Sequence, residues 1–488
     1  MKSASLVARV HKRGAPPPAM SPPWADLRSQ LAEMGVAFGA DAVRDLEAEG
    51  CVEAAEALRG AIAGSPKGSG TRAADAAWAR LKHGVGWTTA AWRECYVLGQ
   101  LRSAVESGED ASGMDSGDNE RRATLLHTAM LAVDMAHVMG APRETARPFA
   151  RAIELLLMKT VNEANAGEEH TADDTAAGLK ISNVLPNGIA PSIDPAHALE
   201  LRPNMTKKEF KKEFFNLDKP VALGCIGKEW VALDKWRDLS WLKATHGHRN
   251  IPLEMNAYDA TDWSEDVKSI TEFIDDYLSP SVEFDRDRTV NVSGDDVDTT
   301  ISTNRQSSKP KNIAYLAQHQ LFEQLPDLLS DFDTPGVCDA FGGAHRVNAW
   351  IGTSGTVTPC HFDSYDNVLG QVCGFKFVRL YHEKDAPFMY RHTAKWESNR
   401  KWPENDDGNE NDDVDEKNIN QTTSNARSAQ GNISQVDVMD PDLSKFPLFR
   451  NAHHMDIVLG PGEFIYIPAR CWHYVEALTT SVSLNFLF

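Results

Sequence analysis

From about residue 200 onward the sequence is a succession of short, β-rich runs, and this pattern restricts the fold more than any other feature. The runs are PVALGCI, VNAWIG, VLGQVC, FKFVRLY, DIVLG, EFIYIP, WHYVEAL and SVSLNFLF. Turn residues such as Gly460-Pro461-Gly462 separate them. Many short strands at this spacing are typical of a β-sandwich or barrel, which we therefore expect for the C-terminal half.

The N-terminal part, from residue 24 to about 165, has a helical pattern instead. In TLLHTAMLAVDMAHVMGAP, Leu126, Met130 and Val133 recur at helical spacing. Gly140 followed by Pro142 marks a helix stop and a new start. We therefore predict a helical bundle or repeat-like module, which serves either as a platform for a partner or simply as a packing domain.

Composition restricts the partners and the compartment. The chain has 488 residues, enough for two or three domains, and a formal net charge of −20. This charge argues against non-specific binding to nucleic acid or to anionic membranes, and it is compatible with a basic protein substrate. The seven cysteines are widely spaced without a CxxC motif, which indicates a reducing compartment. No apolar run is long enough to span a bilayer.

Changes in composition divide the chain into ordered parts and polar segments. Two polar stretches interrupt the C-terminal half and predict disordered loops, because they contain almost no large apolar residues. The basic, proline-rich start predicts a disordered tail, with a transit peptide as the alternative. The predicted division is a tail at 1–23, a helical domain at 24–165, a linker at 166–200, and a β-domain at 201–488 with inserts near 286–309 and 395–430.

The β-rich part begins with a lysine-rich helix. In TKKEFKKEFF, Thr206 and Glu209 have the spacing of a capping box, and Phe210 and Phe214 share one helical face. The lysines are compatible with a localisation signal or with a solvated helix face, and we predict the solvated face.

Two H-x-[DE] triplets occur in the chain, both of them H-x-D, and roughly two are expected by chance with 16 histidines and 70 acids in 488 residues. A facial triad of two histidines and one carboxylate holds iron(II) and leaves coordination positions open. His361 and Asp363 lie two apart in a β-rich region, so their side chains share one face of a strand. More than a hundred residues and several predicted strands follow this pair in the sequence. One of the later strands, in CWHYV, contains His473, which can supply the third ligand. The second triplet, His454-Met455-Asp456, has too little barrel behind it, and we assign it to the surface.

A lysine within an apolar strand is the second unusual feature. In GFKFVRLY, Lys376 alternates with two phenylalanines and shares a face with Val378 and Leu380. A lysine that points into an apolar barrel is costly unless it meets an anion, such as the carboxylate of a cosubstrate. Alternation alone also allows Lys376 to face solvent. Thr358 and Asn367 flank the triad and have groups that can donate hydrogen bonds to the same carboxylate.

These motifs resemble the Jumonji-C (JmjC) branch of the iron(II)/2-oxoglutarate oxygenases. The resemblance is carried by TPCHFD, GFKFVRLY, GPGEFIYIP and WHYV, in that order. YLAQHQLFEQLPDL at 315–328, VNAWIG at 347–352 and SQVDVMDPDLSKFP at 434–447 are also similar to members of this family. The resemblance covers most of residues 75–488, apart from the two inserts. It implies an α+β fold, in which a helical domain precedes a JmjC double-stranded β-helix, a cupin-like jelly roll.

The resemblance also implies roles for individual residues. Iron(II) would be bound by His361, Asp363 and His473. 2-Oxoglutarate would be held by Tyr315, Thr358, Asn367 and Lys376, with Trp350 lining the pocket. Phe362 departs from the polar residue that relatives have there, and it should face away from the iron.

The implied activity is hydroxylation of a protein side chain, most readily an arginyl side chain, with O2 and 2-oxoglutarate as cosubstrates. The alternative with the same iron chemistry is demethylation of N-methyl-lysine in histones. More distant alternatives are a non-catalytic JmjC scaffold and a sugar-binding cupin, although such cupins usually carry H-x-H with a later glutamate.

We expect a protein or peptide substrate that is basic, such as a histone tail or another arginine-containing protein. No direct binding to nucleic acid or membrane is expected, and the expected location is the nucleus, where chromatin would be the target, or the cytoplasm.

Overall fold

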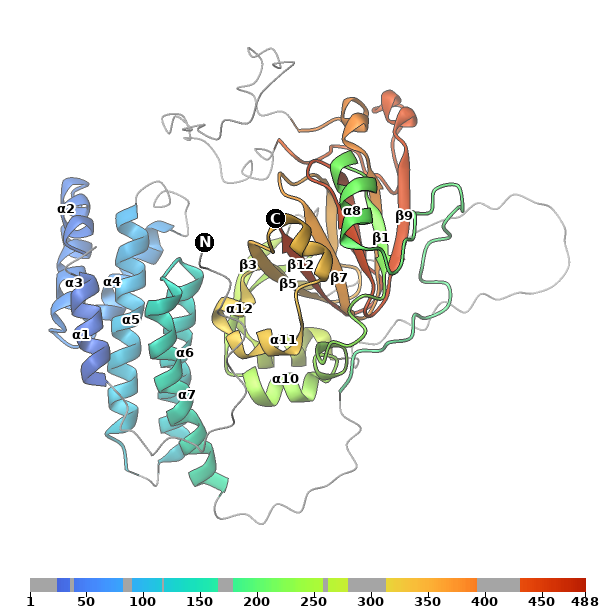
Figure 1. The fold of residues 1–488 in the computed structure, drawn as a ribbon. Coiled ribbons are helices and arrows are strands. Elements are labelled where there is room, and N and C mark those ends of the chain that lie inside the picture. The colour runs from blue at the N-terminus through green and yellow to red at the C-terminus, as the bar shows by residue number, and fades with distance from the viewer. Residues whose placement is uncertain are drawn as a thin grey trace, which may run out of the picture. The chain divides into compact units, whose positions relative to one another are not determined.

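The computed structural model divides the chain into two compact units (Figure 1), one of Met1–Lys82 with Thr89–Glu169 and one of His83–Thr88 with His170–Phe488. The predicted tail at 1–23 and the predicted inserts near 286–309 and 395–430 lie outside the described residues. The described residues are 24–35, 39–81, 90–115, 118–165, 179–257, 262–279, 313–392 and 431–488.

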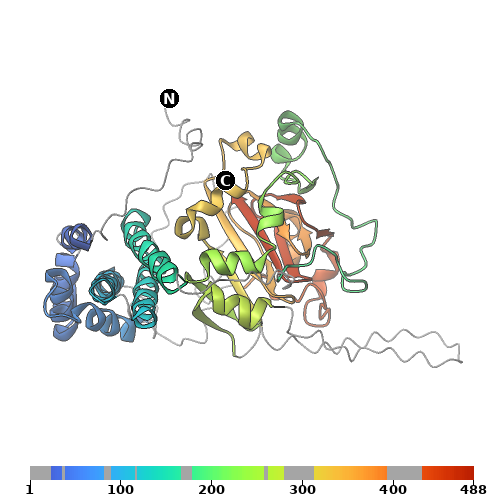
Figure 2. The same cartoon turned by 90° about the horizontal axis from the view of Figure 1, so that it is seen from below.

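The first unit is helical, as its sequence pattern predicts, and Figure 2 looks nearly along several of its helices. From the second helix onward, consecutive helices pack against each other, the first helix packs mainly on the fifth, and their apolar faces form one continuous core. The helices are α1 (Trp24–Met34), α2 (Ala40–Ala48), α3 (Val52–Ala63), α4 (Ser69–Leu81), α5 (Ala90–Ser112), α6 (Asn119–Val138) and α7 (Arg143–Asn165).

Helices α4 and α5 approach so closely that their backbones touch. A Cβ atom added to Gly99 would lie 2.6 Å from the backbone nitrogen of Ala74, and one added to Gly70 would lie 2.8 Å from the carbonyl oxygen of Gly99. The run of small residues in SGTRAADAA therefore has a packing role, because larger side chains would separate the two helices.

The predicted linker at 166–200 is divided between undescribed and packed residues. Residues 166–178 lie outside the described part, whereas residues 179–200 belong to the second unit. The backbone nitrogen of Leu239 donates to the carbonyl of Leu179 at 2.8 Å, and that of Leu199 donates to the carbonyl of Asp456 at 3.0 Å. The packed portion is thus part of the β-domain rather than a free connection.

The second unit is a jelly roll of two antiparallel sheets. The larger sheet has the order β1-β10-β7-β12-β5-β4-β2-β3, and the smaller has the order β6-β11-β8-β9. The strands are β1 (Val221–Gly224), β2 (Asn250–Met255), β3 (Ser264–Ser269), β4 (Ala314–His319), β5 (Arg346–Gly352), β6 (Val357–His361), β7 (Asn367–Cys373), β8 (Lys376–Tyr381), β9 (His454–Leu459), β10 (Phe464–Ile467), β11 (Trp472–Ala477) and β12 (Ser481–Leu487).

Short helices cover the outer face of the larger sheet. Each of them contributes buried apolar side chains to the core that this face shares with β1, β7, β10 and β12. These helices are α8 (Lys207–Glu213), α9 (Ala232–Lys235), α10 (Leu239–His246), α11 (Ile270–Phe273) and α12 (Leu321–Gln324).

Strand β8 shows how the alternation of side chains builds the interior. Val378 and Leu380 join the core between the two sheets, together with Leu369 and Ile467 of the larger sheet. The intervening Phe377 packs on the outer face of the smaller sheet. Residues two apart on a strand share a face, so Lys376 lies on the inner face with Val378.

The second H-x-D triplet lies on β9 and is not a surface feature, contrary to the sequence-based assignment. Asp456 is 5% exposed, and its carboxylate accepts two hydrogen bonds from Arg379, both at 2.8 Å. Arg379 also donates to the carbonyl of Val438 at 2.8 Å. His454 is half-buried and stacks on His197, with 4.2 Å between ring centroids. This triplet therefore joins β8, β9 and two loop segments and has a structural role.

We expect Arg379→Met to lower the free energy of unfolding by about 3–5 kcal/mol, because it leaves the buried carboxylate of Asp456 without a partner. Urea denaturation of the full chain measures this loss. Lys243→Met is the matched control, since Lys243 pairs with Asp275 on the surface, with side-chain exposures of 42% and 46%, and should lose less than about 1 kcal/mol. A second change, Asp456→Leu, should restore much of the stability lost in Arg379→Met. Equal losses in Arg379→Met and Lys243→Met would contradict the structural role of the pair.

All seven cysteines lie in the described residues, and none forms a disulfide. This agrees with the expectation from their spacing. Within the described residues, no helix combines the length and the apolar character that a membrane-spanning helix needs.

Candidate active site

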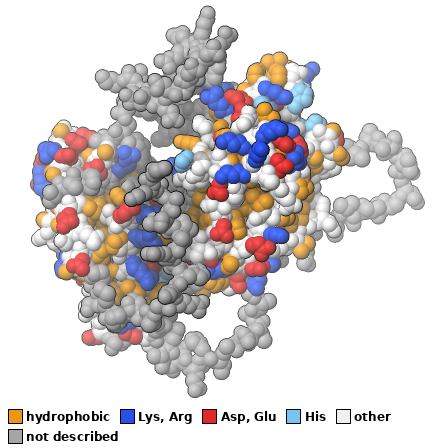
Figure 3. Space-filling view, viewed as in Figure 1, with side chains coloured by type: hydrophobic (Ala, Val, Ile, Leu, Met, Phe, Trp, Pro, Cys, Tyr) orange, Lys and Arg blue, Asp and Glu red, His pale blue; other side chains and the backbone are white. Residues whose placement is uncertain are grey.

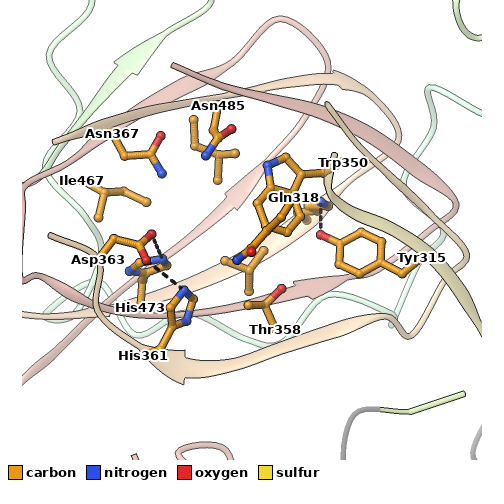
Figure 4. Close-up of a pocket in the computed structure, with 13 residues that line it drawn as sticks. Tyr315, Gln318, Trp350, Thr358, His361, Asp363, Asn367, Ile467, His473 and Asn485 are labelled. Atoms are coloured by element: carbon orange, nitrogen blue, oxygen red, sulfur yellow. Dashed lines mark hydrogen bonds and ion pairs between the residues drawn. The ribbon is translucent and has the colours of Figure 1, made fainter. Parts of the chain in front are cut away.

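The three predicted metal ligands lie close together in one pocket of the jelly roll (Figure 4). His361 is the last residue of β6, and His473 lies directly opposite it on β11. Asp363 follows two residues after β6. One ligand atom from each of the three residues lies within 4.8 Å of the other two. Among the described residues, this is the only group of three or more such side chains with that geometry.

The two histidines present the same nitrogen to the centre of this group. The Nδ1 atom of His361 lies 2.8 Å from the carbonyl oxygen of Pro359, and the Nδ1 atom of His473 lies 3.0 Å from that of Cys471. A carbonyl oxygen only accepts hydrogen bonds, so each Nδ1 carries the proton. Each Nε2 atom therefore has a free lone pair, and each lies 3.8 Å from a carboxylate oxygen of Asp363. This tautomer is the one in which Nε2 binds a metal.

Electrostatics keep His361 neutral, which is the state that a metal ligand requires. Burial lowers the pKa of His361 to about 4, and the neighbouring His473 acts in the same direction. Asp363 opposes both effects. At neutral pH the imidazole is therefore unprotonated at Nε2 and available to a cation.

Asp363 reaches the histidines by a different route from the one predicted. Strand β6 ends at His361, so the i, i+2 rule for strands does not place Asp363. The backbone nitrogen of Arg470 donates instead to the carbonyl of Asp363 at 2.7 Å. Arg470 has a positive φ of 62° in the turn before β11, a conformation that is uncommon for residues other than glycine. This turn ties Asp363 to the strand that carries His473.

Lys376 lies in the same pocket and faces inward. It is 2% exposed, and its Nζ atom donates to the hydroxyl of Tyr315 at 3.3 Å. Burial lowers the pKa of Lys376 to about 7. None of the ion pairs between described residues involves Lys376. A buried lysine without a carboxylate partner is costly, which fits a binding site for an anion.

Further polar atoms in this pocket lack hydrogen-bond partners among the described residues. They are Nε1 of Trp350, Oδ1 of Asn367 and Oδ1 of Asn485. Thr358, whose side chain forms a hydrogen bond with Tyr315, lies on the same wall. The pocket has about 440 Å³ of empty space, including space open to solvent. Buried polar groups normally have partners, so a polar ligand fits this pocket, and a small dicarboxylate matches the lysine and the N–H group of Trp350.

The structure therefore brings every predicted site residue to one pocket. The lining includes His361, Asp363, His473, Tyr315, Trp350, Thr358, Asn367 and Lys376. Phe362 is turned away, as expected, and packs on Trp472 with 4.8 Å between ring centroids.

The pocket also contains two polar residues that sequence reasoning missed. Asn485 lies on β12 and is buried. It is a polar residue in the apolar run SVSLNFLF, which is the same kind of signal that identified Lys376. Gln318 lies at the pocket wall with φ 52°, where the pairing of β4 with β5 is irregular. No local pattern in YLAQHQ indicates that conformation.

A jelly roll with two histidines and a carboxylate at its open end defines the cupin class of metal-binding proteins. Comparison with known families agrees, because the model of the family described as "Cupin-like domain" matches residues 207–488. JmjC domain-containing protein F of Dictyostelium discoideum is 30% identical over 466 residues, which cover 84% of this chain and 85% of the relative.

Two further relatives carry enzyme names. Lysine-specific demethylase JMJ30 of Arabidopsis thaliana is 27% identical and covers 94% of this chain and 91% of its own length. Lysine-specific demethylase 8 of Xenopus tropicalis is 29% identical over 64% of this chain and 58% of its own length. The chain belongs to the JmjC family of cupin-like proteins and is a 2-oxoglutarate-dependent oxygenase.

Proposed function

We propose that the chain hydroxylates an arginyl side chain of a protein substrate, using iron(II) held by His361, Asp363 and His473. The proposal rests on one observation above the others. A buried lysine without a carboxylate partner among the described residues lines the same pocket as the triad. Iron(II) in this site would supply the activation of O2 that couples oxidative decarboxylation of 2-oxoglutarate, to succinate and CO2, with hydroxylation of a C–H bond, one oxygen atom going to each product.

The side chains of the pocket orient the cosubstrate and exclude water. Lys376 and the hydroxyl of Tyr315 bind the distal carboxylate, and Thr358 and Asn367 donate further hydrogen bonds to it. The carbonyls of Pro359 and Cys471 hold the two imidazoles in the tautomer that binds the metal. The apolar residues Leu369, Ile467 and Val475 complete the wall. In this arrangement only the side of the pocket that is open to solvent admits a side chain of the substrate.

A carboxylate on the pocket face of the larger sheet supports a cationic substrate. Glu254 on β2 is the direct partner of Tyr315 on β4, and side chains opposite each other in an antiparallel pair lie on the same face. Its charge contributes to raising the pKa of Tyr315, although burial is the larger cause. The net charge of −20 would also attract a basic protein.

Demethylation of N-methyl-lysine is the second candidate, and the names of two relatives favour it. It uses the same hydroxylation, followed by loss of formaldehyde. The two activities differ in the product, because arginyl hydroxylation adds one oxygen atom and demethylation removes a methyl group.

Mass spectrometry of peptides incubated with the full chain, iron(II), 2-oxoglutarate and ascorbate distinguishes these activities. The set should contain matched peptides with arginine, N-methyl-lysine or neither at the central position. We expect succinate formation together with an added oxygen on the arginine peptide. Formaldehyde from the methyl-lysine peptide would favour the second candidate. No succinate with any peptide would support a non-catalytic scaffold or a sugar-binding cupin.

The affinity for 2-oxoglutarate should depend on pH through Lys376. The pKa of Lys376 is lowered to about 7 by burial, and a bound carboxylate would raise it. Above about pH 7, binding must therefore take up a proton, and the affinity should fall by up to about tenfold for each pH unit. Below about pH 7 the lysine is already charged, and this dependence should disappear.

Anaerobic calorimetry at about pH 6.5 and about pH 8.5, in buffers with different ionisation enthalpies, measures the affinity and the proton uptake together. Proton release at the higher pH, or an affinity that rises with pH, would contradict an ammonium–carboxylate pair at Lys376.

We also propose a nuclear or cytoplasmic location, in keeping with free cysteines and a protein substrate. Histones in chromatin are one class of basic protein that such a location would supply.

A further inference from the structure

Helix α8 carries a row of exposed lysines on the outer side of the β-domain. Thr206 and Glu209 form the predicted capping box, which fixes the start of the helix. Phe210 is fully buried and packs edge-on against Tyr466, with 5.0 Å between ring centroids. This contact fixes which side of the helix faces the core. The exposed side carries Lys207, Lys208, Lys211 and Lys212.

Two more cations lie beside this helix, over the ring of Phe214. The guanidinium of Arg202 is 5.6 Å from the ring centroid, and the ammonium of Lys219 is 5.1 Å from it. Both cations also contact Glu200, and Arg202 contacts Glu213 at 3.0 Å. Figure 3 shows the resulting concentration of Lys and Arg side chains over α8.

Three of the four acids near α8 are already engaged, and the fourth, Asp218, lies beside Lys219 rather than on the helix. Glu209 accepts from Thr206 in the capping box, and Glu200 and Glu213 pair with Arg202 and Lys219. Within the described part of the chain, the four α8 lysines form no ion pair and no hydrogen bond through their side chains. They therefore retain their full positive charge toward solvent.

Two exposed leucines lie in the segments on either side of α8. Leu201, adjacent to Arg202, is 59% exposed, and Leu217, two residues before Lys219, is 61% exposed. Single exposed leucines are common on protein surfaces. Together with the four unpaired lysines of α8 and the ion-paired Arg202 and Lys219, these two leucines form a mixed apolar and basic surface, which we call the α8 surface. It consists of Leu201, Arg202, Lys207, Lys208, Lys211, Lys212, Leu217 and Lys219.

We propose that the α8 surface binds an acidic peptide segment of another protein, in which aliphatic or aromatic side chains are interspersed among the acids. The chain as a whole has a net charge of −20, so its field repels an acidic peptide except where cations are concentrated. Lys207 and Lys211, and likewise Lys208 and Lys212, are four residues apart, which places each pair about 6 Å apart along the helix. A run of carboxylates on an extended or helical peptide matches that spacing.

The leucines select a peptide rather than a nucleic acid. Single-stranded nucleic acid is usually bound by aromatic side chains that stack on bases, combined with a charged groove. The α8 surface offers aliphatic side chains instead, and these gain free energy by covering apolar side chains of a partner. Such a contact would hold an acidic protein at the outer face of the catalytic unit.

Fluorescence anisotropy with the full-length protein tests this proposal. The probe is a labelled synthetic peptide that alternates acidic pairs with leucine, and a second probe replaces each leucine by serine. We expect the triple variant Lys208→Glu, Lys211→Glu, Lys212→Glu to weaken binding of the first probe by more than about tenfold. The double variant Leu201→Ser, Leu217→Ser should weaken the leucine probe and leave the serine probe unchanged.

A charge-matched control separates a defined surface from a general effect of net charge. Lys180, Lys384 and Lys445 are exposed lysines elsewhere in the same unit, and their triple replacement by glutamate changes the net charge equally. Equal loss of binding in both triple variants would overturn the proposal. Turnover of 2-oxoglutarate should be the same in the α8 triple variant as in the unmodified protein, because none of its residues lines the active-site pocket.

Other occupants of the α8 surface give distinct results. An oligonucleotide of equal charge that binds as tightly as the leucine probe would identify a nucleic-acid surface and overturn the proposal. Tighter probe binding after deletion of residues 403–416 would identify the chain's own acidic segment as the occupant. Self-association that the α8 triple variant abolishes would identify a second copy of the chain, and it too would overturn the proposal.

Discussion

His361→Ala is expected to reduce turnover of 2-oxoglutarate by at least about 100-fold while the jelly roll remains folded, because a site with two ligands holds iron(II) weakly and in the wrong place. Asp363→Ala should have the same effect, since its carboxylate faces both Nε2 atoms. Succinate formation measures turnover, and circular dichroism checks the fold. Anaerobic titration with iron(II) shows whether the loss begins with the metal.

His454→Ala is the matched control, because it removes the histidine of the other H-x-D triplet. His454 stacks on His197 and lies beside the Arg379–Asp456 pair, away from the pocket. We expect its loss to affect stability and to leave turnover by the folded protein unchanged. A drop in turnover equal to that of His361→Ala, in a protein that is still folded, would contradict the choice of triplet.

Local sequence patterns predict those parts of the fold that depend on near neighbours. The period of two in FKFVRLY places Val378 and Leu380 on one face, and the structure puts both in the core between the sheets. The same alternation leaves Lys376 free to face inward or outward. Packing of the smaller sheet on the larger one decides the question, because the face that Lys376 shares with Val378 and Leu380 lies against the larger sheet.

Contacts between distant segments account for what the sequence could not predict. Asp363 reaches the histidines through a hydrogen bond from Arg470, which follows it by more than a hundred residues. The short stretch of barrel that follows the second triplet predicts a surface position for Asp456, and the pairing that places Arg379 opposite it is not visible in either strand alone. Both features depend on strand register, which is a property of the assembled sheet.

The two missed pocket residues differ in how far the sequence could have revealed them. Asn485 interrupts an apolar run on the last strand, and a buried amide there requires a polar partner, as it does for the lysine. The same argument that selected Lys376 would have selected Asn485. Gln318 has a positive φ where the pairing of β4 with β5 is irregular, and this backbone conformation places it at the pocket wall. No clear sequence signal marks a residue other than glycine that adopts a positive φ.

Lys376→Met is expected to weaken binding of 2-oxoglutarate by roughly 30-fold or more and to leave iron(II) binding intact. The substitution keeps the length of the side chain and removes its charge. A charged, hydrogen-bonded pair of this kind loses about 2–5 kcal/mol when one partner is removed, and 2 kcal/mol corresponds to about 30-fold in affinity. The lysine is 2% exposed, so solvent cannot replace the missing ammonium.

Anaerobic titration of 2-oxoglutarate into the iron-loaded variant measures this effect directly, and Lys384→Met, at an exposed lysine, is the control. Affinity for the peptide substrate should change much less, because Lys376 lies at the inner end of the pocket, beside Tyr315. The fold should survive, since methionine is favoured over an unpaired ammonium in an apolar interior. If Lys376→Met binds 2-oxoglutarate as tightly as the unmodified protein does, the cosubstrate carboxylate does not lie at this lysine, and another ligand must account for its burial.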